Sequence, residues 1–137
     1  MIVLDTHALI WLIDGSDTLS HGARALIEAA REEDGAFVSA ITPWEISTLV
    51  DKGRIHLAMS VADWMDFVLN LDGMRLAPLE ASTGVDAGRL PGNIHGDPAD
   101  RIVIATARAL RCPLLTSDQR ILRYAREGHV RVIDAGK

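Results

Sequence analysis

The sequence predicts an α/β fold in which a parallel β-sheet of about five strands carries helices on both faces. The first observation is that short apolar segments alternate with amphipathic helical segments along the whole chain. The second is the first segment itself, because Ile2, Val3 and Leu4 are typical of a strand buried on both faces. The third is size: 137 residues, 48% of them hydrophobic, suffice for one domain, residues 1–137, with a substantial core.

Five short segments are expected to form the strands of this sheet. Each is apolar, and each is followed by a polar residue or by proline. They cover residues 1–4, 36–41, 74–77, 113–116 and 130–133. If these strands are parallel, all of their carboxyl ends meet at one edge of the sheet.

The segments between the strands carry helix start signals. Ser20 and Ser60 are favourable N-cap residues, and Asp97 stands directly before a proline at the first helical position. Thr42, with Glu45 three residues later, is typical of a capping box. We expect helices over residues 7–13, after Ser20, from Thr42 to Asp51 or Lys52, after Ser60, over residues 80–88, from Asp97 through Leu110 and around residues 121–125.

Composition and charge exclude several classes of protein. The net charge of −5 is not that of a polybasic nucleic-acid binder, although residues 101–137 hold eight Lys or Arg against three Asp or Glu. The single cysteine, Cys112, cannot form an internal disulfide, which is typical of a reducing compartment. The start of the chain lacks the basic region of a signal peptide, and the apolar run 8–13 is too short to span a bilayer. We therefore expect a protein of a reducing compartment.

Five carboxylates are expected to gather at the carboxyl edge of the predicted sheet. Asp5 ends the first strand, Asp118 follows the fourth, and Glu45 lies in the first turn after the second. Asp97 and Asp100 open the helix that leads into the fourth strand, one helical turn apart. Because ligands bind in the crevice beyond this edge of an open parallel sheet, the acids indicate a functional site.

Such crowded carboxylates resist ionisation unless a cation neutralises them, and Mg²⁺ and Mn²⁺ are the cations that prefer oxygen ligands. Each acid also has a purely structural explanation. Asp5, Asp97 and Asp118 are favourable N-caps, Asp100 is a favourable first-turn charge, and Glu45 completes the capping box. The two explanations are compatible, and the residues alone leave both open.

Other chemistries fit the chain less well. The histidines are scattered without zinc spacing, although His95 lies two residues before Asp97. The chain has no Gly-rich phosphate loop, no G-x-S-x-G and no C-x-x-C. A receiver-like signalling domain would need paired acids after the first strand and a lysine after the last, but the only lysines are Lys52 and Lys137. A phosphatase with an Asp nucleophile would need a second Asp at position 7, where His7 stands.

Four motifs follow one another along the chain. They are Leu4-Asp5-Thr6, Pro43-Trp44-Glu45-Ile46, the stretch from Asp97 to Ala107 that contains D-R-x-x-x-A-T-A, and Leu115-Thr116-Ser117-Asp118. This set, which covers essentially the whole chain, resembles the PIN-domain family. It looks most like the VapC-type toxins of prokaryotic toxin–antitoxin pairs.

The resemblance implies a three-layer α/β/α sandwich and a Mg²⁺- or Mn²⁺-dependent endoribonuclease that hydrolyses RNA phosphodiester bonds. It also implies a cytoplasmic homodimer that is neutralised by a cognate VapB-type antitoxin. Asp5, Glu45, Asp100 and Asp118 match the acidic quartet that binds metal and carries catalysis in this family. Asp97 matches an additional acid found in a subset of the family.

Further residues are expected to serve this site. Thr116 matches the small hydroxyl residue that the family places near its acids, and Thr6 and Asp97 would support the metal ligands from outside. Arg101 and Arg120 are expected to contact RNA, within a run of seven arginines between residues 101 and 131.

Part of the apolar surface formed by residues 9–13, with Trp64 and Met65, is expected to be a groove for the antitoxin or for a second protomer. The alternative is that all of these residues belong to the core of the domain. The alternative to the enzyme is a catalytically silent interaction module of the same fold, which only an assay excludes.

Overall fold

A computed structural model of the chain describes residues 1–136, so that Lys137, the last residue of the predicted domain, lies outside the described residues. Its centre is a five-stranded sheet in the order β3-β2-β1-β4-β5, and every neighbouring pair is parallel. The strands are β1 (Ile2–Leu4), β2 (Ala36–Ser39), β3 (Met74–Ala77), β4 (Leu114–Thr116) and β5 (Val132–Asp134). The predicted parallel sheet is confirmed.

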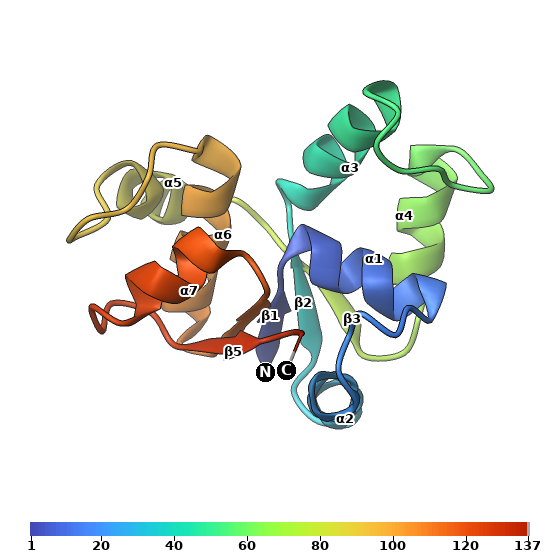
Figure 1. Ribbon diagram of the computed structural model, residues 1–137, viewed down its shortest axis with the longest axis horizontal. Helices are drawn as coiled ribbons and strands as arrows, with labels where there is room; N and C mark the ends of the chain where they lie inside the picture. Colours follow the sequence, from blue (N-terminus) through green and yellow to red (C-terminus); the bar gives the residue numbers. More distant parts are fainter. Residues whose placement is uncertain (137) are drawn as a thin grey trace.

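Seven helices within the described residues cover the two faces of the sheet, which gives the three-layer α/β/α sandwich (Figure 1). They are α1 (Thr6–Asp14), α2 (His21–Glu32), α3 (Thr42–Asp51), α4 (Val61–Leu69), α5 (Ala81–Gly88), α6 (Pro98–Leu110) and α7 (Gln119–Ala125). In Figure 1, α1 to α4 lie on one side of the strands and α5 to α7 on the other. None of the helices in residues 1–136 is long and apolar enough to cross a membrane.

The core consists of two hydrophobic clusters, one on each face of the sheet. Successive residues of a strand point to opposite faces, so that Ile2 and Leu4 belong to the cluster under α1 to α4 while Val3 belongs to the cluster under α6 and α7. All three are at most 3% exposed. Burial of β1 on both faces is the arrangement that its apolar composition predicts.

The strand order reverses at β1, which lies between β2 and β4. The backbone N–H of Asp5 donates to the carbonyl of Leu115 at 2.9 Å, so that the end of β1 is tied to the neighbouring strand β4. In open parallel sheets, a crevice forms outside the strand ends at such a reversal. The topology therefore places Asp5, and the segment that follows Thr116 of β4, beside the same crevice.

Two predicted strand boundaries were wrong. β2 ends at Ser39 instead of residue 41, because the Ser39 hydroxyl accepts a bond from the Ile41 N–H and turns the chain toward α3. β5 begins at Val132 instead of residue 130, because the chain still bends over residues 128–130 after the positive φ of 90° at Gly128, and the register with β4 starts at Val132, opposite Leu114.

The predicted apolar groove was wrong for most of its residues. Leu9, Ile10 and Leu12 of α1, like Trp64 and Met65 of α4, are at most 9% exposed and belong to the core. The reason is that α1 also contacts α3, and that α4, which packs against α3 and β3, shares its core cluster, so that α1 is buried on more than its sheet-facing side. The large apolar side chains that are exposed on α3 and α4 are Trp44, at 61%, and Phe67, at 50%.

Candidate active site

Asp5 lies at the junction of β1 and α1 and is 8% exposed. Its backbone is extended, and its Oδ1 accepts the Thr6 N–H at 2.8 Å, so that Asp5 is the N-cap of α1. Its Oδ2 accepts the Thr116 hydroxyl at 2.6 Å, across from β4. The carboxylate is therefore fixed by two donors from two elements, and the capping explanation and the site explanation hold together.

Glu45 faces the same place from the first turn of α3, but not as part of a capping box. The N-cap of α3 is Ile41, whose side chain makes no capping bond, and Thr42 is already helical and fully buried. The Thr42 hydroxyl instead lies 3.1 Å from the Thr6 hydroxyl, which donates to Glu45 Oε1 at 2.6 Å. The predicted Thr42–Glu45 capping box was thus wrong, because both side chains bond to Thr6 of α1 rather than to their own helix end.

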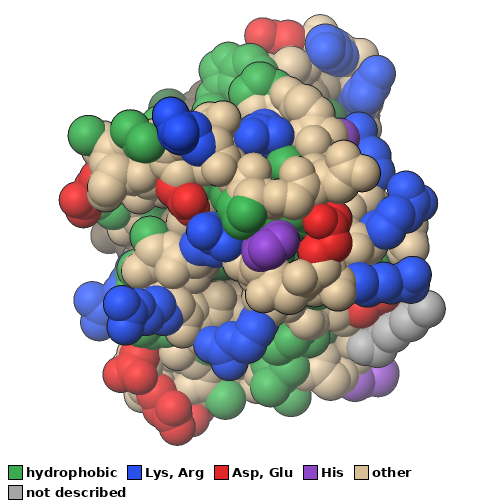
Figure 2. All heavy atoms as spheres, turned by 90° about the vertical axis from the view of Figure 1, so that its left-hand side faces the viewer, with side chains coloured by type: hydrophobic (Ala, Val, Ile, Leu, Met, Phe, Trp, Pro, Cys, Tyr) green, Lys and Arg blue, Asp and Glu red, His purple; other side chains and the backbone are tan. Residues whose placement is uncertain are grey.

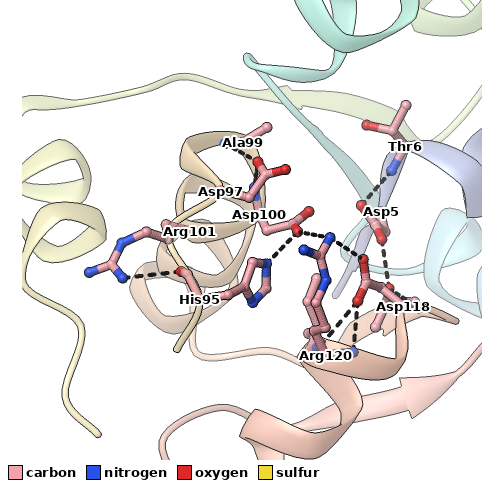
Figure 3. Close-up of polar contacts among 11 residues, drawn as sticks. Asp5, Thr6, His95, Asp97, Ala99, Asp100, Arg101, Asp118 and Arg120 are labelled. Carbon is pink, nitrogen blue, oxygen red and sulfur yellow. Dashed lines mark hydrogen bonds and ion pairs between the residues drawn. The ribbon is translucent and has the colours of Figure 1, made fainter. Parts of the chain in front are cut away.

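Asp97 and Asp100 enter the site from the start of α6. Asp97 is the N-cap of this helix, and its Oδ1 accepts the N–H groups of Ala99 at 3.0 Å and Asp100 at 3.3 Å. Asp100, 7% exposed, lies one turn further, and its Oδ2 is 2.6 Å from Nε2 of His95 (Figure 3). The loop before α6 therefore supplies a histidine that orients the Asp100 carboxylate.

Asp118 closes the site from the segment after β4. Its N–H donates to the Thr116 hydroxyl at 3.1 Å, and its Oδ1 caps α7 through the Arg120 N–H at 2.8 Å and the Ile121 N–H at 3.3 Å. Thr116 thus joins Asp118 to Asp5, which accepts its hydroxyl proton. Thr116 therefore lies between two of the acids, and its support of the metal ligands stays a prediction.

The two arginines expected to contact RNA differ in position. Nη2 of Arg120 lies 3.5 Å from Asp100 Oδ2 and 3.6 Å from Asp118 Oδ2, inside the acidic cluster (Figure 3). Arg101 points away from the cluster, with Nε donating to the Ala87 carbonyl at 2.8 Å and Nη1 to the His95 carbonyl at 3.4 Å. The structure therefore brings Arg120 to the candidate site and gives Arg101 a role in holding α5 and the loop against α6.

A cavity of about 310 Å³ joins these side chains. Its lining comprises Asp5, His7, Glu45, Arg54, Asp97, Asp100, Ser117, Asp118 and Arg120. The five acids that the sequence placed at one edge are thus brought into one cavity. Two arginines and a histidine are the basic groups in this lining, so that carboxylates dominate it.

The electrostatics of the cluster are set chiefly by burial. Loss of solvation raises the pKa of Asp5 and Asp100, and it raises the pKa of Glu45 to about 7. Hydrogen bonds from Thr116 to Asp5, from Thr6 to Glu45 and from His95 to Asp100 act in the opposite direction. Repulsion between neighbouring carboxylates raises each of the three pKa values further, as the crowding predicted, but it is a smaller cause than burial.

The donor set fits a hard divalent cation. All of the acids offer carboxylate oxygens, which suit Mg²⁺ and Mn²⁺, and the cation would relieve the cost of keeping several buried carboxylates charged. Within residues 1–136, however, no three Asp, Glu, His or Cys side chains are already arranged to hold a metal. Three of the carboxylate oxygens have protein partners: Thr6 donates to Glu45 Oε1, Thr116 donates to Asp5 Oδ2, and His95 and Arg120 both contact Asp100 Oδ2.

Two residues of this site had little signal in the sequence. His95 stood out only by lying near Asp97 in a loop, and nothing showed that its ring meets Asp100. Thr42 carried a misleading signal, because a threonine three residues before a glutamate is the pattern of a helix cap. Its contact with Thr6, 36 residues away along the chain, is visible only in the folded protein.

Comparison with known proteins shows the family of the chain. The family model of the PIN domain matches residues 2–127. The chain belongs to the PIN-domain family. A curated relative, Ribonuclease VapC22 of Mycobacterium tuberculosis (strain ATCC 25618 / H37Rv), is 33% identical over 120 residues, which are 88% of each protein.

Solved structures share the PIN fold at lower sequence identity. VapBC2 from Rickettsia felis, bound to a DNA fragment from their promoter, contains a chain with a TM-score of 0.69 at 18% identity, covering 97% of this chain and 98% of that one. A chain of a toxin–antitoxin complex from Klebsiella pneumoniae has a TM-score of 0.65, and a chain of FitAcB from Neisseria gonorrhoeae has a TM-score of 0.61. Each is 18% identical in sequence, and each match covers 98% of both chains. At this identity, the likeness supports the PIN fold itself.

Proposed function

We propose that this PIN domain is a Mg²⁺- or Mn²⁺-dependent endoribonuclease that hydrolyses RNA phosphodiester bonds. The observation that carries the proposal is the convergence of Asp5, Glu45, Asp100 and Asp118, from four separate parts of the chain, on one cavity at the carboxyl edge of the sheet. Buried carboxylates with raised pKa values are costly to the fold and typical of functional sites. The relative whose name is a ribonuclease supports RNA as the substrate.

The four acids have distinct positions that suggest distinct roles. Asp5 and Asp100, each held by donors from outside the cluster, would bind the cation. When bound, the cation supplies a more acidic water and stabilises the charge that develops on the phosphate. Glu45 Oε2 has no partner among the described residues, and with a pKa near 7 this side chain suits the acceptance of a proton from water. Asp118, whose Oδ1 caps α7, would complete the ligands of the cation through its Oδ2.

The α5–α7 side of the molecule offers charge for an RNA backbone. Arg111, Arg123, Arg126 and Arg131 are exposed and form no ion pair with an acid among the described residues. Figure 2 shows basic side chains spread over the face formed by the α5–α7 side of the molecule. Such unpaired cations favour a polyanion, which the acidic protein as a whole does not.

The test is cleavage of total cellular RNA by the purified protein with Mg²⁺, Mn²⁺ or a chelator. We expect cuts that require metal and are absent from a folded Asp5→Asn variant, because the amide keeps the shape of the side chain but not its charge. Cuts that persist in the chelator or in the variant would argue for a contaminating nuclease. No cuts with any metal would favour a catalytically silent module of the same fold.

We further propose that the protein is a cytoplasmic, homodimeric toxin that a VapB-type antitoxin neutralises. The support is the relative named VapC22 and the three structural neighbours, whose names describe VapBC, toxin–antitoxin and FitAcB assemblies. The exposed Trp44 and Phe67 offer apolar surface on the α3–α4 side for such a partner.

A further inference from the structure

The Arg120 guanidinium has an unusual place within the acidic cluster. A single nitrogen, Nη2, lies almost equally far from two carboxylates, 3.5 Å from Asp100 Oδ2 and 3.6 Å from Asp118 Oδ2 (Figure 3). The two acids belong to different elements, one to α6 and the other to the N-cap of α7. One positive charge therefore bridges the two sides of the cavity.

This bridge is held by charge more than by directional hydrogen bonds. Its two contacts are long for an Arg–carboxylate pair, whereas His95 approaches the same Asp100 oxygen to 2.6 Å. The Arg120 side chain is 54% exposed, and no other acceptor for its guanidinium is found among the described residues. Ion pairs of this kind contribute little to stability, so the guanidinium can leave at small cost.

We propose that Arg120 occupies the place of the divalent cation in the metal-free protein and competes with that cation for Asp100 and Asp118. The inference rests on the proposed metal-dependent function of the cavity. Binding of the cation then requires the guanidinium to leave, and the affinity of the site for metal is lower than that of the four carboxylates alone. Because its side chain extends from the first turn of α7 at the rim of the cavity, a displaced Arg120 remains available to a phosphate of the RNA.

The chain offers a matched control for the competition. Arg54 also lines the cavity, but it forms no ion pair with an acid among residues 1–136. Removing either arginine takes one positive charge from the same cavity. If Arg120 acts only through its charge at a distance, Arg120→Gln and Arg54→Gln will change metal affinity equally, whereas competition at the carboxylates makes Arg120→Gln the larger change.

The experiment is a calorimetric titration of Mg²⁺ and of Mn²⁺ into the wild-type protein and both variants, without RNA, after circular dichroism has shown that the variants fold. We expect Arg120→Gln to bind Mg²⁺ more tightly by a factor of roughly 2 to 30, the range that two displaced surface ion pairs give. We expect the Mg²⁺ affinity of Arg54→Gln to lie within about twofold of the wild-type affinity, because Arg54 has no ion-pair partner within the described residues that the metal would displace. Thermal unfolding supplies a second readout: Arg120→Gln should lower Tm without metal and leave Tm unchanged at saturating metal.

Equal affinities for wild type and Arg120→Gln, weaker binding by Arg120→Gln, or equal gains in the two variants would each overturn the competition. So would the failure of wild type and Arg120→Gln alike to bind either metal. Only the failure to bind either metal would also contradict the proposed metal-dependent nuclease. The other results concern metal affinity alone and leave that proposal standing, because the titration contains no RNA. If the wild type cleaves no RNA but Arg120→Gln binds metal more tightly than Arg54→Gln, the proposed competition is supported and the proposed nuclease activity is contradicted.

Discussion

At the scale of single residues, Glu45 shows how burial gives a carboxylate a functional pKa. Its pKa rises to about 7, mainly because α3 and α1 remove it from water, and its bond from Thr6 only partly offsets this effect. A carboxyl whose pKa is higher in the folded state than in the unfolded state binds more protons when folded. The metal-free protein should therefore lose stability as the pH rises from about 4.5 to about 7.

This dependence gives a prediction for Glu45→Gln. The amide keeps an oxygen for the Thr6 hydroxyl but carries no charge, so that it removes the pH-dependent cost at this position. Without metal, we expect the Tm of the variant to exceed that of wild type by a few degrees at pH 8 and to match it at pH 5. Differential scanning calorimetry at both pH values measures this. A Glu45→Gln protein that is less stable than wild type at pH 8 would contradict the raised pKa.

Thr116 gives a second prediction, because its buried hydroxyl donates to Asp5 Oδ2 and accepts from the Asp118 N–H. Thr116→Val keeps the shape but leaves a buried carboxylate oxygen without its donor, which we expect to cost about 1.5 to 3 kcal/mol. Thr116→Ser keeps the hydroxyl and loses one methyl group, at about 1 kcal/mol. Urea unfolding of both variants separates the two effects, and equal losses would show that packing matters here and the hydrogen bond does not.

The sequence predicted which acids line the site better than it predicted their hydrogen-bond partners. Asp5 and Asp118 were predictable because each follows a short apolar strand, and parallel strands end at one edge. The partners of these acids were not predictable in the same way. Thr6 meets Glu45 across 39 positions, and Thr116 meets Asp5 across 111, so that only the packed helices bring them together.

At the scale of elements, α6 shows that a helix cap and a site acid can be neighbours with different tasks. Asp97 satisfies two N–H groups at the helix start, and this cap presents Asp100 one turn later to the cavity. The sequence predicted this element well, because an N-cap acid, a proline and a periodic apolar face all agree. It predicted β5 less well, because the start of an edge strand depends on where it pairs with β4.

Asp97 can be tested as a cap. Asn is as good an N-cap as Asp, whereas Ala lacks the acceptor. We expect Asp97→Ala to lower the free energy of unfolding by about 1 kcal/mol and Asp97→Asn to leave it nearly unchanged, as measured in urea. If Asp97→Asn were destabilised as much as Asp97→Ala, the charge of Asp97 and not its capping bonds would be what α6 needs.

At the scale of the whole molecule, the two sides of the sheet differ in surface chemistry. The α5–α7 side carries the unpaired arginines, while α3 and α4 expose Trp44 and Phe67. Sequence periodicity could not find this apolar surface, because it cannot tell a helix that packs on the sheet alone from one that also packs against neighbouring helices. The residues expected to line a groove on α1 are core for that reason.

The proposed partner gives a prediction for this surface. The protein would be co-purified with its proposed VapB-type antitoxin, as wild type, as Trp44→Asp and as Val85→Asp. Trp44 and Val85 are similarly exposed, at 61% and 63%, but lie on opposite sides of the sheet. We expect Trp44→Asp to weaken the complex by at least about tenfold, the loss typical of an aromatic anchor, and Val85→Asp to retain it. Retention by Trp44→Asp and loss by Val85→Asp would move the interface to α5.

The central claim is that four acids form one metal-dependent nuclease site, and the most direct test is the rate at which matched amide variants cleave one defined RNA at saturating Mn²⁺. We predict that the cleavage rate of each amide variant lies at least about a hundredfold below that of wild type, as the loss of a metal ligand or general base requires. The variants are Asp5→Asn, Glu45→Gln, Asp100→Asn and Asp118→Asn. The control Asp63→Asn, an exposed acid on α4, should cleave at the wild-type rate. Near-wild-type cleavage by any of the four folded variants would contradict the site as described.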